Sequence, residues 1–494
     1  MAEADRRWTR RDFLGLAAVS AVGAALPAGA ARAAVAADPV PQAAHPFVSR
    51  PDLVPPNVVV DVAAAGTVPG HIFLAPFVIT GTVSSHSGAM IVDERGQLVW
   101  FKAISKKTAM DLRVQTYRGG SVLTWYEGDV LGGYGGDYVI ADRHYRELAR
   151  VSAGNGRHGD LHEFLITSRG TALVTIYQLV PADLTSLGGP AAGQLVEGIV
   201  QEIDIPSGRV LFEWRSSEHV ALDESYLATV SKQGSSDYFH LNSVAVDADG
   251  HLLVSARHTS AVYKVDRKTG DVLWRLGGKR SDFAFDPGAS FSFQHDVRRH
   301  RDGTLTIFDN AASAPAAPGH GTPAASRVVR LTVDEGRMLA GLVAEYLPPR
   351  PRLAWAMGNA QQLPDGGLFV DWGTAGAFTE FGPAGDVRFD ASFGDASVSY
   401  RAFRFPWVGL PGGRPAVAAS RSGGNATLHV TWNGATEVAR WLVRSASGAA
   451  LARARRSGFE TSIALPAGHR STTVTVTALD AHGRPLGTSA PVRL

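Results

Sequence analysis

The chain has 494 residues, 45% of them hydrophobic and 19% charged, so it is long enough for two or three domains and too apolar for wholesale disorder. Lys and Arg number 48 against 46 Asp and Glu, and beyond residue 33 the two signs are equal in number, which argues against nucleic acid as the main partner. Cysteine is absent, which excludes a disulfide scaffold, a zinc finger, an iron–sulfur cluster and a cysteine nucleophile.

The N-terminus carries the pattern of an export signal. Arg10 and Arg11 precede an apolar, Ala-rich run that extends to Ala30, and residues 31–33 offer a small-residue cleavage site. This order predicts a twin-arginine signal peptide over residues 1–33, recognised by the twin-arginine translocation machinery. No later run reaches the roughly 18 apolar residues that span a bilayer. We therefore expect an exported protein, secreted or held in the periplasm or cell envelope, without a stable membrane anchor.

Residues 34–68 are expected to form a lead-in segment, and a repeat follows over residues 69–408. Each repeat has two halves, and each half has two short β-rich runs around a turn. The first halves are HEFLITSRGTALVTIY (162–177), NSVAVDADGHLLVSARH (242–258), HDVRRHRDGTLTIFDN (295–310), GNAQQLPDGGLFVDWG (358–373) and, more loosely, DLRVQTYRGGSVLTWYEG (111–128). Asp-Gly and Gly-Gly turns between such runs are strong hairpin signals.

The second halves complete a four-stranded unit. They are MIVDERGQLVWF (90–101), YVIADRHYRELARV (138–151), VQEIDIPSGRVLFEW (200–214), VYKVDRKTGDVLWRL (262–276), VVRLTVDEGRMLAGL (328–342) and FTEFGPAGDVRFDAS (378–392). With a degenerate first copy, the repeats number six. Four-stranded repeats of about 45–65 residues predict an all-β, six-bladed β-propeller. A pair of β-sandwiches is the alternative.

Residues 412–494 change in character. After a Pro/Gly stretch, alternating runs such as ATLHVTWNG (426–434) and TTVTVTALD (472–480) follow at short spacing. This pattern predicts an immunoglobulin- or fibronectin-like β-sandwich. No cluster of catalytic residue types occurs there.

The repeats place polar residues at one equivalent position. His162, Asn242 and His295 each lie eight residues before the turn glycine of a first half, and Asn359 lies eight residues before Gly367 and seven before Gly366. His240 lies two residues before Asn242, so on a strand the two side chains face the same side, and Arg257 follows on the return run of the same repeat. If the first runs line the centre of a propeller, residues far apart in sequence meet in one funnel. The candidate site therefore comprises His162, His240, Asn242, Arg257, His295 and Asn359. His258 lacks this spacing and is left outside the site.

These residue types suit the transfer of an oxyanion group. Three histidines could also bind zinc or copper, but Arg257 beside them disfavours a cation and favours a tetrahedral oxyanion. A neutral imidazole is a nucleophile, and an imidazolium can protonate a leaving oxygen. The site thus fits sulfuryl or phosphoryl transfer, and the absence of a Walker loop argues against phosphoryl transfer from nucleotides.

Three segments resemble those of the bacterial arylsulfotransferases that do not use the nucleotide sulfate donor. They are DYFHLNSVAVD to LLVSARH (237–258), FSFQHDVRR to GTLTIFDN (291–310) and GNAQQLPDGG to WG (358–373). The segment TWNGATEVARW (431–441) looks like the actinobacterial branch. The resemblance implies a six-bladed propeller with its active site at the central channel. It also implies ping-pong transfer of a sulfuryl group from an aryl sulfate to a phenol through a sulfohistidine, without cofactor or metal.

By the same resemblance, each residue receives a role. His295 is the nucleophile, and His240 assists as acid/base or as a sulfate ligand. Asn242 binds a sulfate oxygen, Arg257 neutralises the sulfuryl oxygens, and His162 is the remaining histidine of the channel. Asn359 is added from its spacing alone.

Three other functions stay open. An exported propeller could bind a polyanion or a protein without catalysis, and a sulfatase could use the same site with water as acceptor. A quinone-cofactor dehydrogenase would need a carboxylate cluster for calcium, which the equivalent positions lack. Release of a chromogenic phenol with and without an acceptor phenol separates transfer, hydrolysis and binding.

Overall fold

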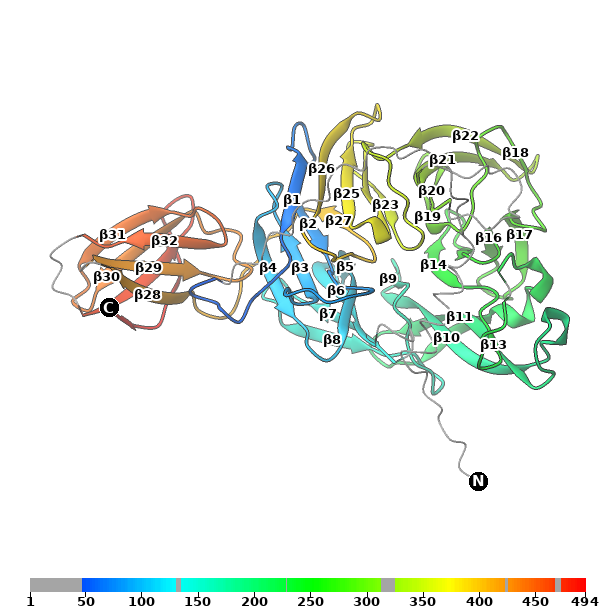
Figure 1. The fold of residues 1–494 in the computed structure, drawn as a ribbon, viewed down its shortest axis with the longest axis horizontal. Coiled ribbons are helices and arrows are strands. Elements are labelled where there is room, and N and C mark those ends of the chain that lie inside the picture. Colours follow the sequence, from blue (N-terminus) through cyan, green and yellow to red (C-terminus); the bar gives the residue numbers. More distant parts are fainter. Residues whose placement is uncertain (1–46, 130–134, 228, 312–324, 423–424, 467–471) are drawn as a thin grey trace, which may run out of the picture.

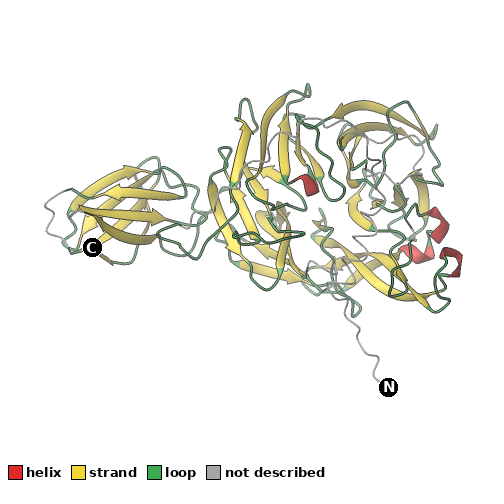
Figure 2. Ribbon diagram, in the orientation of Figure 1, coloured by secondary structure: helices red, strands yellow, loops and turns green. Residues whose placement is uncertain are grey.

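The regular structure of the protein is almost entirely β. The computed structural model describes residues 47–129, 135–227, 229–311, 325–422, 425–466 and 472–494. Helical turns in these ranges are limited to four short 3-10 segments (Figure 2), namely η1 (Thr185–Leu187), η2 (Ser216–Glu218), η3 (Leu222–Glu224) and η4 (Gly373–Ala375). The predicted all-β class is confirmed. A helix with the length and hydrophobicity of a membrane span does not occur in the described ranges. The predicted signal peptide lies outside the described residues.

The strands form eight sheets, which we number along the chain. Sheet 1 is β27-β2-β3-β4 (Phe403–Phe405, His71–Leu74, Gly88–Val92, Leu98–Ala103). Sheet 2 is β5-β6-β7-β8 (Thr108–Tyr117, Gly120–Gly128, Asp137–Ala141, Glu147–Val151). Sheet 3 is β9-β10-β11-β12 (Phe164–Ile166, Thr171–Ala182, Gly193–Asp204, Val210–Arg215), with β13 (Ser235–Ser236) parallel to β11.

Sheets 4 to 6 repeat this order. Sheet 4 is β14-β15-β16-β17 (Leu241–Val246, Leu252–Ala256, Ala261–Val265, Val272–Gly277). Sheet 5 is β19-β20-β21-β22 (His295–Arg299, Leu305–Asp309, Arg327–Asp334, Leu339–Tyr346), with β18 (Ala284–Phe285) parallel to β22. Sheet 6 is β23-β24-β25-β26-β1 (Asn359–Gln362, Leu368–Asp371, Ala377–Phe381, Val387–Phe393, Val58–Val62).

The C-terminal strands form a separate body beside sheet 1 (Figure 1). Sheet 7 is β28-β29-β32 (Ala416–Ser422, Asn425–Thr431, Glu460–Ala464). Sheet 8 is β31-β30-β33-β34 (Ala450–Arg455, Arg440–Ser445, Thr473–Leu479, Pro485–Thr488), with β35 (Val492–Arg493) paired to β33.

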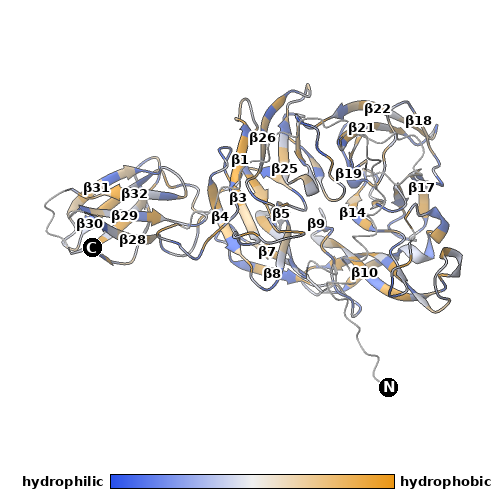
Figure 3. Ribbon diagram, viewed as in Figure 1, coloured by the Kyte–Doolittle hydropathy of each residue, from blue (hydrophilic) through white to orange (hydrophobic). Residues whose placement is uncertain are grey.

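Every hairpin predicted from the sequence in residues 90–392 is confirmed as an antiparallel strand pair. Turn glycines such as Gly170, Gly250 and Gly303 adopt φ of 75°, 91° and 82°, which a residue with a side chain adopts only at a cost. Along the strands hydrophobic and hydrophilic residues intermix (Figure 3), as expected for alternating faces.

The core lies between neighbouring sheets. One apolar cluster joins sheets 1 and 2, with Phe73 and Ile91 facing Leu123 and Val139, and similar clusters join each following pair up to sheets 5 and 6. A further cluster packs sheet 6 against sheet 1. At the first strands, β5 contacts β9 and β27, β14 contacts β10 and β19, and β23 contacts β19. Sheets 1 to 6 therefore follow one another in a cycle.

Two strands pair with a sheet that is distant from them in the sequence. β1 falls inside the expected lead-in 34–68, yet it pairs antiparallel with β26 as the outer strand of sheet 6. β27, from the end of the repeat region, pairs with β2 from its beginning. The amide of Asn359 accepts from Ala402 N (2.9 Å) and donates to Ala402 O (3.0 Å), just before β27. Gln361 makes the same double contact with Arg404, so β23 fastens the strand that closes the cycle.

Candidate functional site

The predicted positions fall where the first strands begin. His162 lies two residues before β9, Asn242 is the second residue of β14, and His295 and Asn359 start β19 and β23. Asp111, which lies eight residues before Gly119, is the fourth residue of β5 and lies 3.2 Å from Arg401. The spacing therefore places its residues near the first strands without giving them one common position.

Backbone irregularities re-aim the side chains at this position. His240 and Asp296 have φ of 55° and 52°, in the left-handed region. The strand pairing shifts between Leu241 and Ser243 in β14, and between His295 and Arg298 in β19. Such bulges are frequent next to active sites because they turn individual side chains out of strict alternation. The simple alternation expected for His240 and Asn242 does not apply here.

Two of the predicted histidines lie against Tyr400, and the third lies against one of these two. The ring centroid of His162 lies 5.4 Å from that of His240 and 5.4 Å from that of Tyr400. The His295 ring lies 6.5 Å from Tyr400. His258, left outside by the sequence analysis, joins the group with its ring 4.5 Å from His240.

Two of these histidines face carboxylates. His162 Nδ1 lies 2.5 Å from Asp160 Oδ1, and His240 Nδ1 lies 2.5 Å from Asp237 Oδ2. Each carboxylate holds the ring proton on Nδ1, so Nε2 is the nitrogen left for substrate. Burial lowers the pKa of His240 well below its ordinary value, with His162 and Arg257 adding to the effect, and burial raises the pKa of Asp237.

His295 faces an amide instead. The Asn310 Nδ2 donates to the carbonyls of Ala354 (2.8 Å) and Met357 (2.9 Å), so Asn310 Oδ1 must accept. His295 Nδ1 therefore donates to Asn310 Oδ1 at 2.7 Å, and Nε2 carries the lone pair. The Met357 N–H approaches that Nε2 at 3.3 Å. Burial, and next the charge of Arg257, lower the pKa of His295 well below its ordinary value.

Arg257 lies beside the histidines, and one of its three nitrogens has no partner among the described residues. Its Nη1 donates to His258 Nε2 (2.9 Å) and its Nη2 to the Trp355 carbonyl (2.8 Å), while Nε is buried without a partner among the described residues. The guanidinium also lies 5.1 Å from the Phe293 ring centroid. Burial lowers the pKa of Arg257 to about 10, so it is charged at neutral pH. An oxyanion would provide the missing acceptor.

The contact from Arg257 fixes His258 as a neutral ring. Because its Nε2 accepts from Arg257, its Nδ1 donates to the Asp237 carbonyl, at 2.7 Å. Burial lowers the pKa of His258 to about 3. His258 thus orients the arginine and Asp237 without being available as an acid.

The two predicted asparagines have structural partners. Asn242 Nδ2 donates to the Gln294 carbonyl at 2.6 Å, directly before His295, and its buried Oδ1 has no partner among the described residues. Asn359 uses both amide atoms on Ala402, as described above. The structure therefore brings His162, His240, Arg257 and His295 together, has Asn242 support the His295 segment, and has Asn359 fasten β27.

A layer of buried charges lies behind the histidines. Glu163, Asp296 and Arg401 each follow a residue of the cluster and bind one another in place of the histidines. Arg401 Nη1 lies 3.2 Å from Glu163 Oε1, and Arg401 Nε lies 3.4 Å from Asp296. Burial opposes ionisation of Glu163, yet Arg298, Arg401 and Arg113 hold its pKa below the usual range.

One group among the described residues could hold a metal ion. The ligand atoms of Asp237, His240 and His258 lie within 4.8 Å of one another. Both nitrogens of His258 already serve Arg257 and Asp237, and the arginine charge next to the group opposes a cation. The donor set fits an anion site better than a metal centre.

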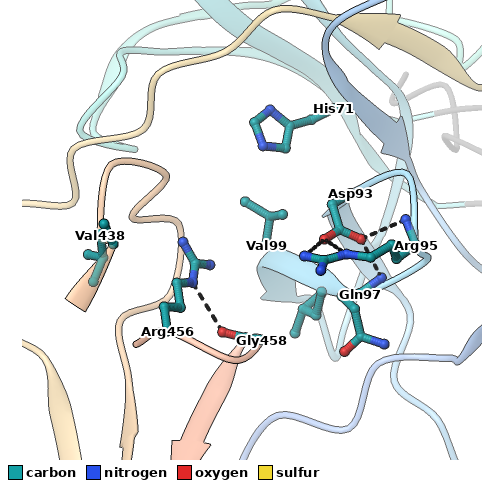
Figure 4. A pocket seen from close by; sticks show the side chains of 10 residues that line it. His71, Asp93, Arg95, Gln97, Val99, Val438, Arg456 and Gly458 are labelled. Atoms are coloured by element: carbon teal, nitrogen blue, oxygen red, sulfur yellow. Dashed lines mark hydrogen bonds and ion pairs between the residues drawn. The ribbon is translucent and has the colours of Figure 1, made fainter. Parts of the chain in front are cut away.

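A pocket of about 220 Å³ lies elsewhere, between sheet 1 and the C-terminal body. In Figure 4, Arg456 points toward it from one side and His71 lies at another, while Asp93 binds Arg95 and the Gln97 N–H. Burial lowers the pKa of both His71 and Arg456. None of its lining residues belongs to the histidine cluster.

The sequence analysis missed the partners of the histidines. Asp160 and Asp237 lie two and three residues before His162 and His240, and Asn310 ends the segment GTLTIFDN. Tyr400, whose hydroxyl donates to the Asn242 carbonyl at 3.1 Å, lies just before β27. Local spacing could have suggested the two aspartates, whereas Asn310 and Tyr400 reach the site only through long-range pairing.

Comparisons with known proteins point to one family. The profile described as arylsulfotransferase (ASST) matches residues 113–394, more than half of the chain. No curated protein matches.

Solved structures match more distantly. A protein of unknown function from Bacteroides caccae has 13% identity over 68% of this chain and 99% of that chain, with a TM-score of 0.42. One from Dyadobacter fermentans has 12% identity over 81% and 99%, with a TM-score of 0.38. Virginiamycin B lyase from Staphylococcus aureus has 10% identity over 76% and 94%, with a TM-score of 0.31. These TM-scores give the three likenesses no weight for architecture or activity.

Proposed function

The chain belongs to the arylsulfotransferase family, and from this premise we propose that it moves a sulfuryl group from an aryl sulfate to a phenol through a sulfohistidine on His295. The observation that carries the proposal is the state of His295. It is buried, its Nδ1 donates to Asn310, and its Nε2 holds the lone pair that a nucleophile requires.

The proposed first half-reaction forms the intermediate. The Nε2 lone pair of His295 attacks sulfur, the bond from sulfur to the aryl oxygen breaks, and its electron pair leaves with that oxygen. His162, as an imidazolium beside the Asp160 carboxylate, gives its Nε2 proton to the departing phenolate. Arg257, whose Nε lacks an acceptor, stabilises the sulfuryl oxygens.

The second half-reaction reverses these movements. The acceptor phenol gives its proton to the same histidine while its oxygen attacks sulfur. The bond between nitrogen and sulfur breaks, and the electron pair returns to Nε2. Burial of the cluster favours a phenol over water as acceptor, because a dry site suppresses hydrolysis.

We further propose that sheets 1 to 6 are the blades of a six-bladed β-propeller over residues 69–408, to which β1 from the lead-in adds an outer strand, and that sheets 7 and 8 form a β-sandwich over 412–494. The cyclic order of the apolar clusters supports the first assignment. The histidine cluster would then lie near the central axis.

We also propose export through the twin-arginine pathway, with residues 1–33 removed and 34–68 left as the lead-in. The arginine pair and the cleavage pattern support this. Changing both Arg10 and Arg11 to Lys should leave precursor in the cytoplasm, and unchanged export of that variant would refute the proposal.

The experiment for the activity uses a chromogenic aryl sulfate with and without phenol. Release that depends on phenol supports transfer, release without phenol indicates a sulfatase, and no release indicates a binding protein. Exposure to the donor alone should add one sulfuryl mass to the peptide that contains His295, and phenol should remove it.

A further inference from the structure

We propose that Asn310 is the positioning residue that makes His295 the nucleophile, while Asp160 equips His162 to carry the proton. The inference rests on the proposed function and deepens it. His295 and His162 lie in the same cluster but differ in the group that accepts from Nδ1, which is an amide for His295 and a carboxylate for His162.

Asn310 cannot exchange its two ends. It is fully buried, and its nitrogen is fixed by the carbonyls of Ala354 and Met357. Both residues belong to the segment that also contacts Arg257, through Trp355, and His295 Nε2, through Met357. The orientation of the amide, and with it the His295 tautomer, is therefore set by backbone that surrounds the site.

Within the described part of the chain, no carboxylate stabilises a protonated His295. Its hydrogen-bond partners are Asn310 and the Met357 N–H, and the titratable or charged groups facing it are Arg257, His162, His240 and Tyr400. The adjacent Asp296 is turned away, with its oxygens on Arg298 and the Ala360 N–H. The His295 ring is therefore neutral before the reaction begins.

The amide matters most after attack. Once Nε2 has bonded to sulfur, the ring is cationic and its Nδ1 proton faces Asn310 Oδ1. A neutral amide oxygen does not remove that proton, so the ring stays a good leaving group when phenol attacks. A carboxylate at this position would accept the Nδ1 proton. The sulfated ring would then be neutral, and its bond to sulfur would break more slowly when phenol attacks.

The same contrast explains His162. Asp160 Oδ1 accepts from both Nδ1 and the backbone N–H of His162, and a carboxylate stabilises the imidazolium that must protonate the leaving phenolate. Asp160 Oδ2 has no hydrogen-bond partner among the described residues, so Asp160→Asn can place its amide nitrogen there without losing a contact.

The first test is Asn310→Asp. Sulfuryl label on the His295 peptide should form, and its discharge by phenol in a single turnover should slow by about tenfold or more. The acid limb of donor consumption against pH should also move to higher pH, because a carboxylate beside Nδ1 favours the charged ring. Asn425→Asp, on the exposed end of β29, is the matched control and should discharge like the wild type.

The second test is Asp160→Asn. It should slow labelling by phenyl sulfate more than labelling by 4-nitrophenyl sulfate, whose leaving group needs no proton. Equal losses with the two donors would overturn the role of Asp160. If Asn310→Asp proves unfolded by circular dichroism, this variant still decides the part of the inference that concerns His162.

Failures of the two levels are distinguishable. A wild type that neither turns over nor takes up label refutes the proposed function. The role of Asn310 alone is refuted if the wild type works normally and the folded Asn310→Asp variant behaves like it. In that case phenol discharges the sulfuryl label of the variant at the wild-type rate, and the pH profile is unchanged.

Discussion

Arg401 and Glu163 lie 238 residues apart in the chain and form an ion pair of 3.2 Å in which neither side chain reaches solvent. Glu163 also binds Arg113 and Arg298. Replacing one member leaves buried charges uncompensated, so Glu163→Gln should lower the free energy of unfolding by about 3–5 kcal/mol, measured by urea titration.

The control is an exposed pair. Arg146 lies 2.8 Å from Asp142 and its side chain is 70% exposed. Arg146→Ala should change the free energy of unfolding by less than about 1 kcal/mol. Equal effects of the two substitutions would contradict a structural role for the buried charges.

Substitutions of the three site histidines should lower turnover by different amounts. His295→Asn should abolish transfer because the two-step route disappears with the nucleophile. His162→Asn and His240→Asn should each lower kcat about 10²–10³-fold and leave measurable turnover. Near-normal turnover of His295→Asn, or label on another residue, would show that the nucleophile is assigned wrongly.

Turnover should survive exhaustive chelation. Arg257 occupies His258 Nε2 at 2.9 Å and brings a positive charge to the group of Asp237, His240 and His258, which is the one candidate metal group in the described residues. The assay compares chelated and untreated protein with the same aryl sulfate and phenol. Activity lost on chelation and restored by zinc or calcium would instead indicate a metal-dependent reaction.

Stability should fall as the solution is acidified through pH 6.5. Burial lowers the folded-state pKa of His240, His258 and His295, and that of His258 falls to about 3. Below their unfolded pKa of about 6.5, the unfolded chain binds more protons than the folded chain, so the histidine contribution is present above that pH and is lost on acidification.

Urea midpoints at pH 7.5 and 5.5 measure this effect. Asp371, whose pKa burial raises well above its ordinary value, acts in the opposite direction. The informative quantity is therefore the difference between wild type and His295→Asn, whose stability should depend less on pH. A variant with an unchanged or steeper pH dependence would contradict a neutral, buried His295.

Deleting residues 412–494 should leave transfer largely intact, because the histidine cluster lies in the six-sheet body. It should also promote self-association. Asn433 exchanges two hydrogen bonds with the backbone of Phe101, and Gly434 N–H donates to Val99, so the C-terminal body covers the β4 edge. Turnover and light scattering test both parts. A folded truncation without activity would show that the C-terminal body shapes the site.

Sequence reasoning succeeded where the determinants are local. Turn glycines and alternating runs predicted the hairpins, and the spacing to Gly170, Gly250 and Gly303 located the starts of β9, β14 and β19. A histidine at the start of one such strand must lie near its counterparts once neighbouring sheets pack face to face. His162 and His295 were found in this way.

Sequence reasoning failed where the direction or the partner of a side chain depends on one backbone irregularity or on one distant strand pairing. The bulge beside His240 and its φ of 55° depend on the return strand, so alternation misplaced Asn242 relative to His240. Asn359 has the same spacing as His295, yet its amide fastens Ala402, from a segment 43 residues away. The position of a residue in its repeat predicts where its side chain lies. The hydrogen-bond partners of that side chain depend on which distant segment packs beside it.

The pairing of β27 with β2 sets the order in which this molecule can be completed during synthesis. β2, β3 and β4 leave the ribosome early, but the edge of β2 stays unpaired until residues 403–405 emerge. Tyr400 and Arg401 arrive in the same short segment, and they supply the ring between the histidines and the cation behind them. A chain released before that segment would have most of its strands and no finished site. Catalytic competence is thus among the last properties the nascent chain acquires.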